Sequence, residues 1–160
     1  MNIGVVSDTH NSDAGIPNKI LESLKNMDMI LHAGDLMELK ILESLKSVCK
    51  DVKAVWGNMD SKDIRKQLPE KQIISVGKYR IGLTHGSGAP AFLIELVTDI
   101  FKSDNVNIII FGHSHYPINE RRGKILYFNP GSLTDKVFCP FNSYGIIEIN
   151  EEIKARIVKI

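Results

Sequence analysis

The sequence predicts an α/β protein, a four-layer α/β/β/α sandwich in which two mixed sheets pack face to face and are flanked by helices. Three observations predict this fold. Apolar runs alternate with helical patterns early in the chain, strands without intervening helices fill its end, and polar residues follow nearly every apolar run. A chain of 160 residues is about one domain long, so we expect residues 1–160 to form a single domain.

The first third of the chain alternates strands with helices. Residues 3–6, 29–33 and 52–56 are short apolar runs that end in polar or glycine residues, which is typical of buried strands. Two amphipathic helices are predicted between them by apolar residues spaced three and four apart: Ile20, Leu21, Leu24 and Met27, then Leu42, Leu45 and Cys49. Successive strand–helix units predict parallel strands with right-handed crossovers.

The middle of the chain changes character. Residues 72–76 and 79–84 flank Gly77-Lys78, which predicts a β-hairpin. A broad apolar face then predicts a helix over 91–101, and 106–111 is the next predicted strand.

Three further strands are predicted near the end of the chain, at 125–128, 144–149 and 153–158. No helical pattern separates them, so we expect them to pair antiparallel with one another.

Composition excludes several classes of protein. The 20 basic and 19 acidic residues give a net charge of +1, which provides no field to attract DNA or an anionic membrane. No apolar run approaches the roughly 20 residues that cross a membrane, and no charged region precedes an apolar one at the N-terminus. Cys49 and Cys139 form no Cys-x-x-Cys pattern, which favours a reduced, cytoplasmic protein.

Seven potential metal ligands follow the predicted strands: Asp8, His10, Asp35, Asn58, His85, His113 and His115. They include four of the five histidines in the chain. Carboxylate, imidazole and amide donors together suit Mn²⁺, Fe or Zn²⁺ better than Mg²⁺ or Ca²⁺. Seven ligands are too many for one ion, so we expect two divalent ions about 3.5–4 Å apart that share a carboxylate.

Five short motifs that contain these ligands resemble, in order, the signature blocks of the calcineurin-like metallophosphoesterases: Asp8-Thr9-His10, Gly34-Asp35, Gly57-Asn58-Met59-Asp60, His85-Gly86 and Gly112-His113-Ser114-His115. The chain length and the turn at 129–132 resemble the small single-domain phosphodiesterase branch of that family. The resemblance covers nearly the whole chain.

The resemblance implies a role for each ligand. Asp8, His10 and His115 would hold the first metal, Asn58, His85 and His113 the second, and Asp35 would bridge both. The chemistry of the family is in-line attack of a metal-bridging hydroxide on phosphorus, and the small branch acts on phosphodiesters. This resemblance makes Asp35, Asn58 and His85 the catalytic candidates. We expect Mn²⁺ as the metal, with Ni²⁺, Fe and Zn²⁺ as alternatives, and a small phosphodiester as the substrate.

One position departs from the family pattern. Many members carry a histidine where this chain has Met59, and that histidine stabilises the transition state or protonates the leaving group. A thioether can do neither, although the small phosphodiesterases often lack this histidine as well. Asp60 and His32 are the remaining candidates for a general acid.

Two interpretations are possible for several other residues. His32 is expected to be a buried residue that orients Asp35 rather than a ligand. Trp56 is expected in the core rather than stacked on a base. Either a solvated helix face or a phosphate contact fits the basic residues Lys62, Arg65 and Lys66.

Two further pairs follow the histidine blocks. Arg121 and Arg122 are placed in a loop near the ligands, with a substrate role as the alternative. Asn129 and Ser132 are expected to form a turn and could order the metal ligands.

Three other functions are compatible with the motifs to differing degrees. A phosphomonoesterase would use the same site. A non-catalytic scaffold, like the retromer subunit with this fold, would tolerate a degenerate site, whereas all seven positions are filled here. The repair exonucleases of the superfamily need additional domains to grip DNA, so we expect no nucleic-acid partner other than a small nucleotide ester. The oligomeric state stays open, a homo-oligomer included.

Overall fold

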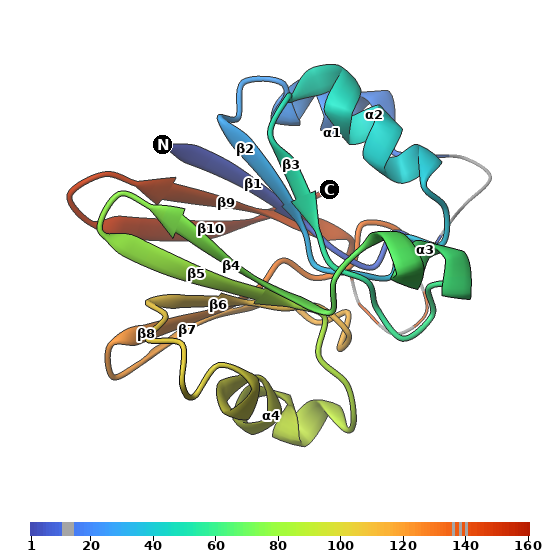
Figure 1. Cartoon of the computed structure of the whole chain (residues 1–160). Helices are drawn as coiled ribbons and strands as arrows, with labels where there is room; N and C mark the ends of the chain where they lie inside the picture. Colours follow the sequence, from blue (N-terminus) through green and yellow to red (C-terminus); the bar gives the residue numbers. More distant parts are fainter. Residues whose placement is uncertain (11–14, 136, 138, 140) are drawn as a thin grey trace.

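Two five-stranded sheets stack face to face in the computed structural model, which describes residues 1–10, 15–135, 137, 139 and 141–160 (Figure 1). The first sheet has the order β10-β9-β1-β2-β3 and the second the order β4-β5-β6-β8-β7. Both are mixed, because each contains parallel and antiparallel pairs. Helices α1 and α2 cover the outer face of the first sheet and α4 covers that of the second, which confirms the predicted four layers.

The strands of the first sheet are β1 (Asn2–Val6), β2 (Met29–His32), β3 (Val52–Ala54), β9 (Ser143–Ile149) and β10 (Ile153–Lys159). Those of the second are β4 (Lys71–Val76), β5 (Tyr79–Thr84), β6 (Ile108–Ile110), β7 (Ile118–Arg122) and β8 (Ile125–Asn129). The helices are α1 (Asn18–Leu24), α2 (Lys40–Val48), α3 (Lys62–Gln67) and α4 (Leu93–Ile100), the last preceded by a 3₁₀ turn at Pro90–Phe92.

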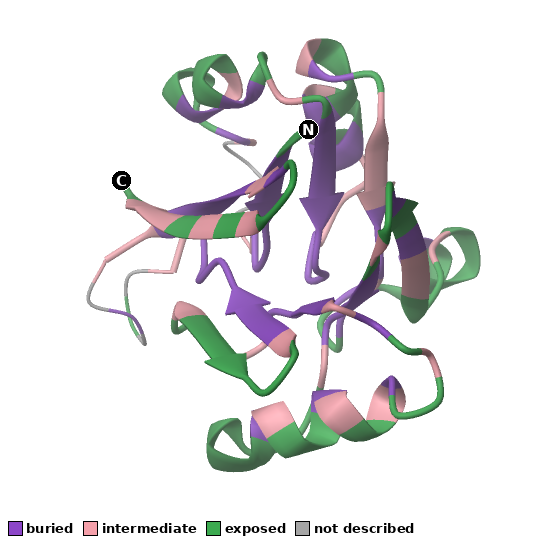
Figure 2. Cartoon of the chain, turned by 90° about the vertical axis from the view of Figure 1, so that its left-hand side faces the viewer, coloured by how far each residue is buried: buried purple, intermediate pink, exposed green. Residues whose placement is uncertain are grey.

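Side-chain alternation along the strands builds three apolar layers. Ile3 and Val5 of β1 point between the two sheets, whereas Val6 packs under α1 and α2. In β6, Ile108 and Ile110 join the layer between the sheets and Ile109 packs against α4. Figure 2 shows the result: the inner strands are buried and the outer faces of the helices are exposed. Strands buried on both faces read as continuous apolar runs, which is why the sequence indicated them clearly.

The connections agree with the predicted parallel units and hairpin. β1 pairs parallel with β2, and β2 with β3. β4 and β5 pair antiparallel around Gly77-Lys78, as expected. Because β1, β2, β3, β5 and β6 all point the same way in their sheets, their carboxyl ends gather at one end of the sandwich.

The predicted pairing at the end of the chain was wrong in part. β9 and β10 pair antiparallel, but β8 lies in the other sheet, where it pairs parallel with β6. The chain crosses from one sheet to the other between β8 and β9. Sequence pattern could not reveal this crossing, because it carries no information on which strands become neighbours.

A strand was also missed where Arg121 and Arg122 were placed in a loop. They lie on β7, an edge strand in which four of five residues are exposed. In the antiparallel register Ile118 lies opposite Asn129 and Arg122 opposite Ile125, so the arginines occupy the end of β7 farther from the strand ends. Arg122 pairs with Glu95 at 3.2 Å and with Glu120 at 2.9 Å. These ion pairs give Arg122 a structural role on the outer surface.

Candidate metal centre

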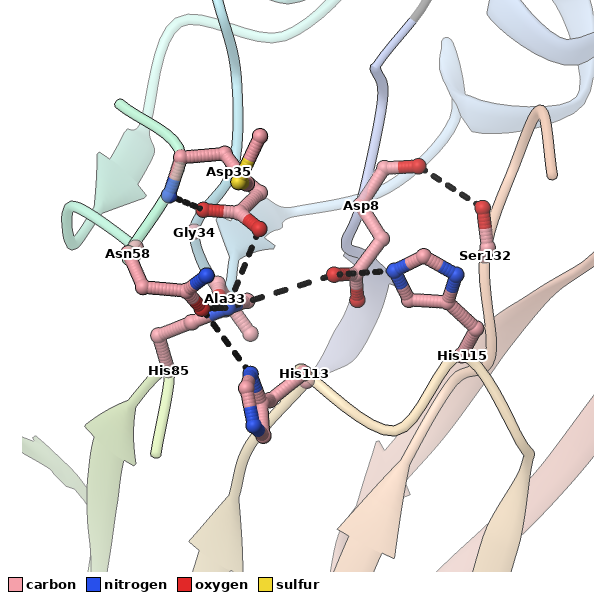
Figure 3. A network of polar contacts seen from close by, with 12 residues as sticks. Asp8, Ala33, Gly34, Asp35, Asn58, His85, His113, His115 and Ser132 are labelled. Carbon is pink, nitrogen blue, oxygen red and sulfur yellow. Dashed lines mark hydrogen bonds and ion pairs between the residues drawn. The ribbon is translucent and has the colours of Figure 1, made fainter. Parts of the chain in front are cut away.

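All seven predicted ligands lie at the gathered strand ends, each in the loop that follows a strand. Asp8 and His10 follow β1, Asp35 follows β2, Asn58 follows β3, His85 follows β5, and His113 and His115 follow β6. Figure 3 shows the side chains of Asp8, Asp35, Asn58, His85, His113 and His115 pointing toward a common space. Residues up to 107 positions apart in the chain therefore meet because parallel strands end at the same edge of the sandwich.

Asp8, His10 and His115 form the first ligand group. Oδ1 of Asp8 lies 3.3 Å from Nε2 of His115 and 3.6 Å from Nε2 of His10. The two Nε2 atoms are 2.9 Å apart. A carboxylate oxygen and two ring nitrogens thus face one another at distances that suit three ligands of one cation.

Asn58, His85 and His113 form the second group, joined to the first by Asp35. Oδ1 of Asn58 lies 3.1 Å from Nε2 of His85 and 2.9 Å from Nδ1 of His113. Oδ2 of Asp35 lies 3.3 Å from Nε2 of His85 and 3.9 Å from Nε2 of His10. One carboxylate oxygen therefore reaches both groups, the position that a bridging ligand requires.

The burial and the contacts of the Asp8 carboxylate indicate whether these residues suit a cation. Its side chain is fully buried, and neither oxygen accepts a hydrogen bond of good geometry within the described part of the chain. Oδ1 also lies 4.0 Å from Nε2 of His85, so Asp8 sits between the two groups. A buried carboxylate without hydrogen bonds is costly unless a cation compensates it. The donor set therefore fits a divalent metal.

Local electrostatics keep the carboxylates ionised. Burial would raise the pKa of Asp8, but the imidazoles of His10 and His115 lower it below its ordinary value. Burial likewise opposes the lowered pKa of Asp35, which His85 and the backbone N–H of Met59 produce. Both carboxylates are therefore anionic at neutral pH, the state that binding of a divalent cation would require.

Hydrogen bonds behind three of the histidines orient their rings. Nδ1 of His85 faces the carbonyl oxygen of Ala33 at 2.7 Å, and Nε2 of His113 faces that of Gly88 at 2.8 Å. Nδ1 of His115 lies 2.5 Å from Oδ2 of Asp135. Each of these acceptors takes a ring N–H. The other nitrogen of each ring faces the candidate ligand groups, and it is the nitrogen that would give up any proton when a cation binds.

The backbone at the centre is strained in a way that singles out the ligands. Asp8, Asp35, His113 and His115 have φ values of 54°, 55°, 69° and 57°, in the left-handed region. Only two other non-glycine residues of the described chain share that region. Side chains with a Cβ adopt it at a cost, and such residues concentrate at functional sites. The fold thus accepts strain to aim these side chains.

Asn129 and Ser132 lie where they order the loops that carry the candidate ligands, which is the second of the two roles considered for them from the sequence. The hydroxyl of Ser132 donates to the carbonyl oxygen of Asp8 at 2.8 Å. Nδ2 of Asn129 donates to the carbonyl oxygen of Gly112 at 2.7 Å, next to His113. Both side chains are fully buried, so these bonds fix the backbone from which the ligands project.

Glycines allow the close approach of the loops. A Cβ at Gly34, where φ is 97°, would lie 2.7 Å from Nδ1 of His85. A Cβ at Gly57 would lie 2.6 Å from the backbone nitrogen of Asp35. Both distances are too short for real atoms, so the glycines that precede Asp35 and Asn58 are sterically required.

His32 is fully buried, as the sequence predicted, and it acts on the loops around Asp35. Nε2 lies 3.0 Å from the hydroxyl of Thr9, and Nδ1 accepts the N–H of Gly34 at 3.2 Å. Burial lowers the pKa of His32 to about 3, so the ring is neutral. A neutral ring whose two nitrogens are both engaged cannot serve as a general acid.

Asp60 holds the loop between β3 and α3 against the loop that carries Asp35. Its carboxylate accepts backbone N–H groups from Asp35 at 3.0 Å, Gly57 at 2.8 Å and Met37 at 2.8 Å. The sequence had suggested Asp60 as a substitute general acid. Its oxygens are instead committed to three donors, and the side chain is buried.

We predict that Asp60→Asn destabilises the protein by about 1–3 kcal/mol, because an amide offers one acceptor oxygen where the carboxylate uses two. Urea unfolding measures the difference. The matched control is Asp63→Asn, since the side chain of Asp63 is exposed on α3 and Lys66 is its only partner among the contacts described. The control should stay within about 0.5 kcal/mol of the parent. Equal stability of both variants would show that the three bonds to Asp60 contribute nothing.

Arg65 has a role that neither reading of the sequence anticipated. Its guanidinium donates to the carbonyl oxygens of Asn58 at 2.6 Å and Asp60 at 2.9 Å. It also stacks over Trp56, with 4.7 Å from Cζ to the ring centroid. Arg65 therefore braces the loop that presents Asn58. Trp56 is only partly buried and belongs to none of the three apolar layers, so the prediction that it packs in the core was wrong.

The metal-free protein should lose stability as the pH rises from 6.5 to 9. Asp8 raises the pKa of His115 to about 9, with Asp135 adding to the effect and burial opposing it. Protonated His115 therefore stabilises the folded state below pH 6.5, and this contribution disappears as the pH passes through 9. A rise from 6.5 to about 9 corresponds to about 3 kcal/mol at about 1.36 kcal/mol per unit.

Urea unfolding in chelator at pH 6.5 and 9 measures this pH dependence, with His115→Gln as the comparison. The loss of stability between the two pH values should be smaller in the variant than in the parent. Part of the loss should remain, because the pKa of His85 is also raised. A parent that is equally stable at both pH values would contradict the charged pairing of His115 with the two carboxylates.

Comparison with known families agrees with this geometry. The family model for the calcineurin-like phosphoesterase superfamily domain matches residues 1–152. A probable metallophosphoesterase of Methanocaldococcus jannaschii is 35% identical, over 100% of this chain and 82% of the relative. A phosphodiesterase of Escherichia coli K12 is 34% identical, over 68% of this chain and 59% of that protein.

Solved structures share the fold along the whole chain. Wild-type Vps29 of Entamoeba histolytica in complex with Zn²⁺ matches with a TM-score of 0.78 and 25% identity, over 99% of both chains. An archaeal phosphodiesterase matches with a TM-score of 0.80 over 100% of both chains; at 22% identity this second likeness concerns the fold alone. The family model, the relatives and the four-layer fold agree, and the chain belongs to the calcineurin-like phosphoesterase superfamily.

Proposed function

We propose that this protein is a metal-dependent phosphodiesterase that hydrolyses small phosphodiesters at a site for two divalent cations. The observation that carries the proposal is the meeting of two ligand groups through one oxygen of Asp35, beside the buried carboxylate of Asp8 that has no hydrogen bond within the described chain. Among the relatives, one of Methanocaldococcus jannaschii and one of Escherichia coli are named phosphodiesterases.

Each residue has an assigned part in this proposal. Asp8, His10 and His115 hold the first cation, Asn58, His85 and His113 hold the second, and Asp35 bridges them. Bound there, the cations acidify a water to supply the nucleophile and neutralise charge on the phosphoryl oxygens. The strained backbone and the bonds behind the rings hold the ligands in place before the substrate binds.

Asp35, Asn58 and His85 are the residues to which we assign the catalytic role. Nε2 of His85 lies 3.1 Å from Oδ1 of Asn58 and 3.3 Å from Oδ2 of Asp35, and burial of His85 and Asp35 keeps water from competing for them. The nitrogen and oxygen donors favour Mn²⁺, with Ni²⁺, Fe and Zn²⁺ as the alternatives. The Zn²⁺ complex of Vps29 supports a borderline metal rather than Ca²⁺.

A diester with a good leaving group suits the site better than a monoester, because none of the three residues considered as a general acid can donate a proton. Met59 occupies the place of the family histidine, His32 is neutral and buried, and Asp60 is bound to three backbone donors. A monoesterase with the same ligands is the second candidate. A metal-binding scaffold is the third, supported by the structural likeness to Vps29.

The cellular setting completes the proposal. None of the helices in the described ranges is long and apolar enough to cross a membrane. We take residues 1–160 as one domain that acts in the cytoplasm, with a small diester rather than a nucleic acid or a membrane as its partner.

Turnover of a panel of phosphodiesters and phosphomonoesters, after chelation and with each metal restored separately, tests the function. We expect no activity without metal, because the chain has no nucleophilic serine or cysteine motif. Once Mn²⁺ is added, we expect faster hydrolysis of aryl diesters than of the matched monoesters. Activity that survives complete chelation would overturn the proposal. Metal binding without turnover of any ester would favour the scaffold.

A further inference from the structure

The hydrogen bonds behind the ligand histidines are not equivalent. His85 and His113 face the neutral carbonyl oxygens of Ala33 and Gly88. His115 faces the carboxylate of Asp135 at 2.5 Å, a charged acceptor in a side chain that is 7% exposed. Asp135 lies 20 residues beyond His115, outside all five sequence motifs, and nothing in the pattern of apolar runs indicated it.

The two ligand groups also differ in charge, and the group that contains His115 is the more negative. The first group contains the carboxylate of Asp8 and has Asp135 directly behind His115. The second contains the uncharged amide of Asn58, and Asp35 is shared between both. A carboxylate behind a ligand imidazole makes the ring a stronger donor, and additional anionic charge raises affinity for a divalent cation.

We infer that Asp135 is a positioning residue that makes the group of Asp8, His10 and His115 the tighter of the two cation sites, so that this site fills first. The inference rests on the two-cation site of the proposed function and adds an order of loading to it. Asp135 is not a ligand of the cation; it acts by keeping the Nδ1 proton of His115 in place, so that Nε2 is the nitrogen that binds the cation.

The second contact of Asp135 makes its substitution by asparagine informative. Oδ1 accepts the backbone N–H of Val137 at 2.7 Å while Oδ2 faces Nδ1 of His115. An amide at this position has one acceptor for these two donors. If its oxygen serves Val137, its NH₂ group faces His115, and the ring must move its proton to Nε2. A protonated Nε2 cannot ligate a cation.

The order of loading is measurable in the parent protein alone. Metal-free protein with ¹⁵N-labelled histidine is titrated with Zn²⁺, and the ring nitrogens are followed by long-range ¹H–¹⁵N spectra. We expect the signals of His10 and His115 to change during the first equivalent of Zn²⁺, and those of His85 and His113 during the second. In both steps Nδ1 of His115 should keep its proton. The reverse order, or simultaneous change of all four rings, would overturn the inference.

The role of Asp135 is then measured by Zn²⁺ calorimetry of Asp135→Asn, with Asp63→Asn as the control for the loss of one negative charge. The affinity of the first step should fall about 10–100-fold while that of the second is unchanged. Should the asparagine variant fail to fold, Asp135→Ala removes the acceptor without adding a donor, and we expect it to weaken the first step too.

The outcomes separate this inference from the function on which it rests. A parent that binds no Zn²⁺ would refute the two-cation site and the inference together. A parent that binds two Zn²⁺ with a first step that Asp135→Asn leaves unchanged would refute the role of Asp135 alone. Equal weakening of both steps would also refute it, because that result indicates a general disturbance of the fold.

Discussion

Replacing Asp35 by asparagine should lower diesterase activity about 10³-fold or more and leave at most one cation bound. Oδ2 of Asp35 is the atom that reaches both ligand groups, at 3.3 Å from His85 and 3.9 Å from His10. A neutral amide cannot compensate two dications that lie side by side. Stabilisation by a metal pair is worth several kcal/mol, and about 4 kcal/mol corresponds to about 10³-fold in rate.

The test combines kcat/KM for an aryl diester with metal content after dialysis. The amide oxygen at position 35 can still accept the N–H of Met59, now bonded at 2.8 Å, so we expect the variant to fold. Asp63→Asn serves as control, because Asp63 is exposed and its loss should leave rate and metal content unchanged. Two tightly bound ions and a near-parental rate in Asp35→Asn would contradict the bridging role.

The rate of diester hydrolysis should fall steeply as the pKa of the leaving group rises. Met59 is 55% exposed and cannot donate a proton. His32 and Asp60 both accept hydrogen bonds from backbone N–H groups, so neither is available as an acid. Without a general acid the departing oxygen must carry the developing charge itself. The ratio of aryl to alkyl diester rates should therefore be about 10²–10⁴-fold larger than with a positioned acid, since that is the usual contribution of such an acid.

The variant Met59→His tests this explanation in the same series of diesters. An imidazole there should accelerate alkyl diesters more than aryl ones and make the dependence on leaving-group pKa shallower. Its effect depends on the orientation of the ring, because position 59 is exposed and packing does not fix a side chain there. A shallow dependence in the parent that does not change in the variant would mean that another group already donates the proton.

The meeting of the candidate ligands was predictable from the sequence, because their positions depend on where the strands end. Asp8 and Asp35 each follow a continuous apolar run, and the end of such a run is visible without a structure. Parallel pairing of β1 with β2 then brings these ends together, with Asp8 donating its N–H to the carbonyl oxygen of Gly34. The strand ends that carry the seven candidate ligands could thus be located from local pattern, whereas the roles of these residues as ligands stay a prediction.

The residues that support the ligands could not be predicted in this way. Asp135 reaches His115 across 20 residues, and Asp60 binds the backbone of Asp35 from 25 residues away. Such contacts depend on how loops pack, which leaves no periodicity in the sequence. β7 was missed because it is an exposed edge strand that consists mainly of charged residues and so lacks an apolar run. Charged side chains on an edge strand disfavour pairing with a further strand.

The most direct test of the central claim is the position of the metal ions themselves. Crystals grown with Mn²⁺ are measured on both sides of the manganese absorption edge, and anomalous differences locate each ion. We expect two ions within about 4 Å of each other. One should contact Asp8, His10 and His115, the other Asn58, His85 and His113, and Asp35 should contact both. A single ion at full Mn²⁺ saturation, or two ions without a shared Asp35, would contradict the account.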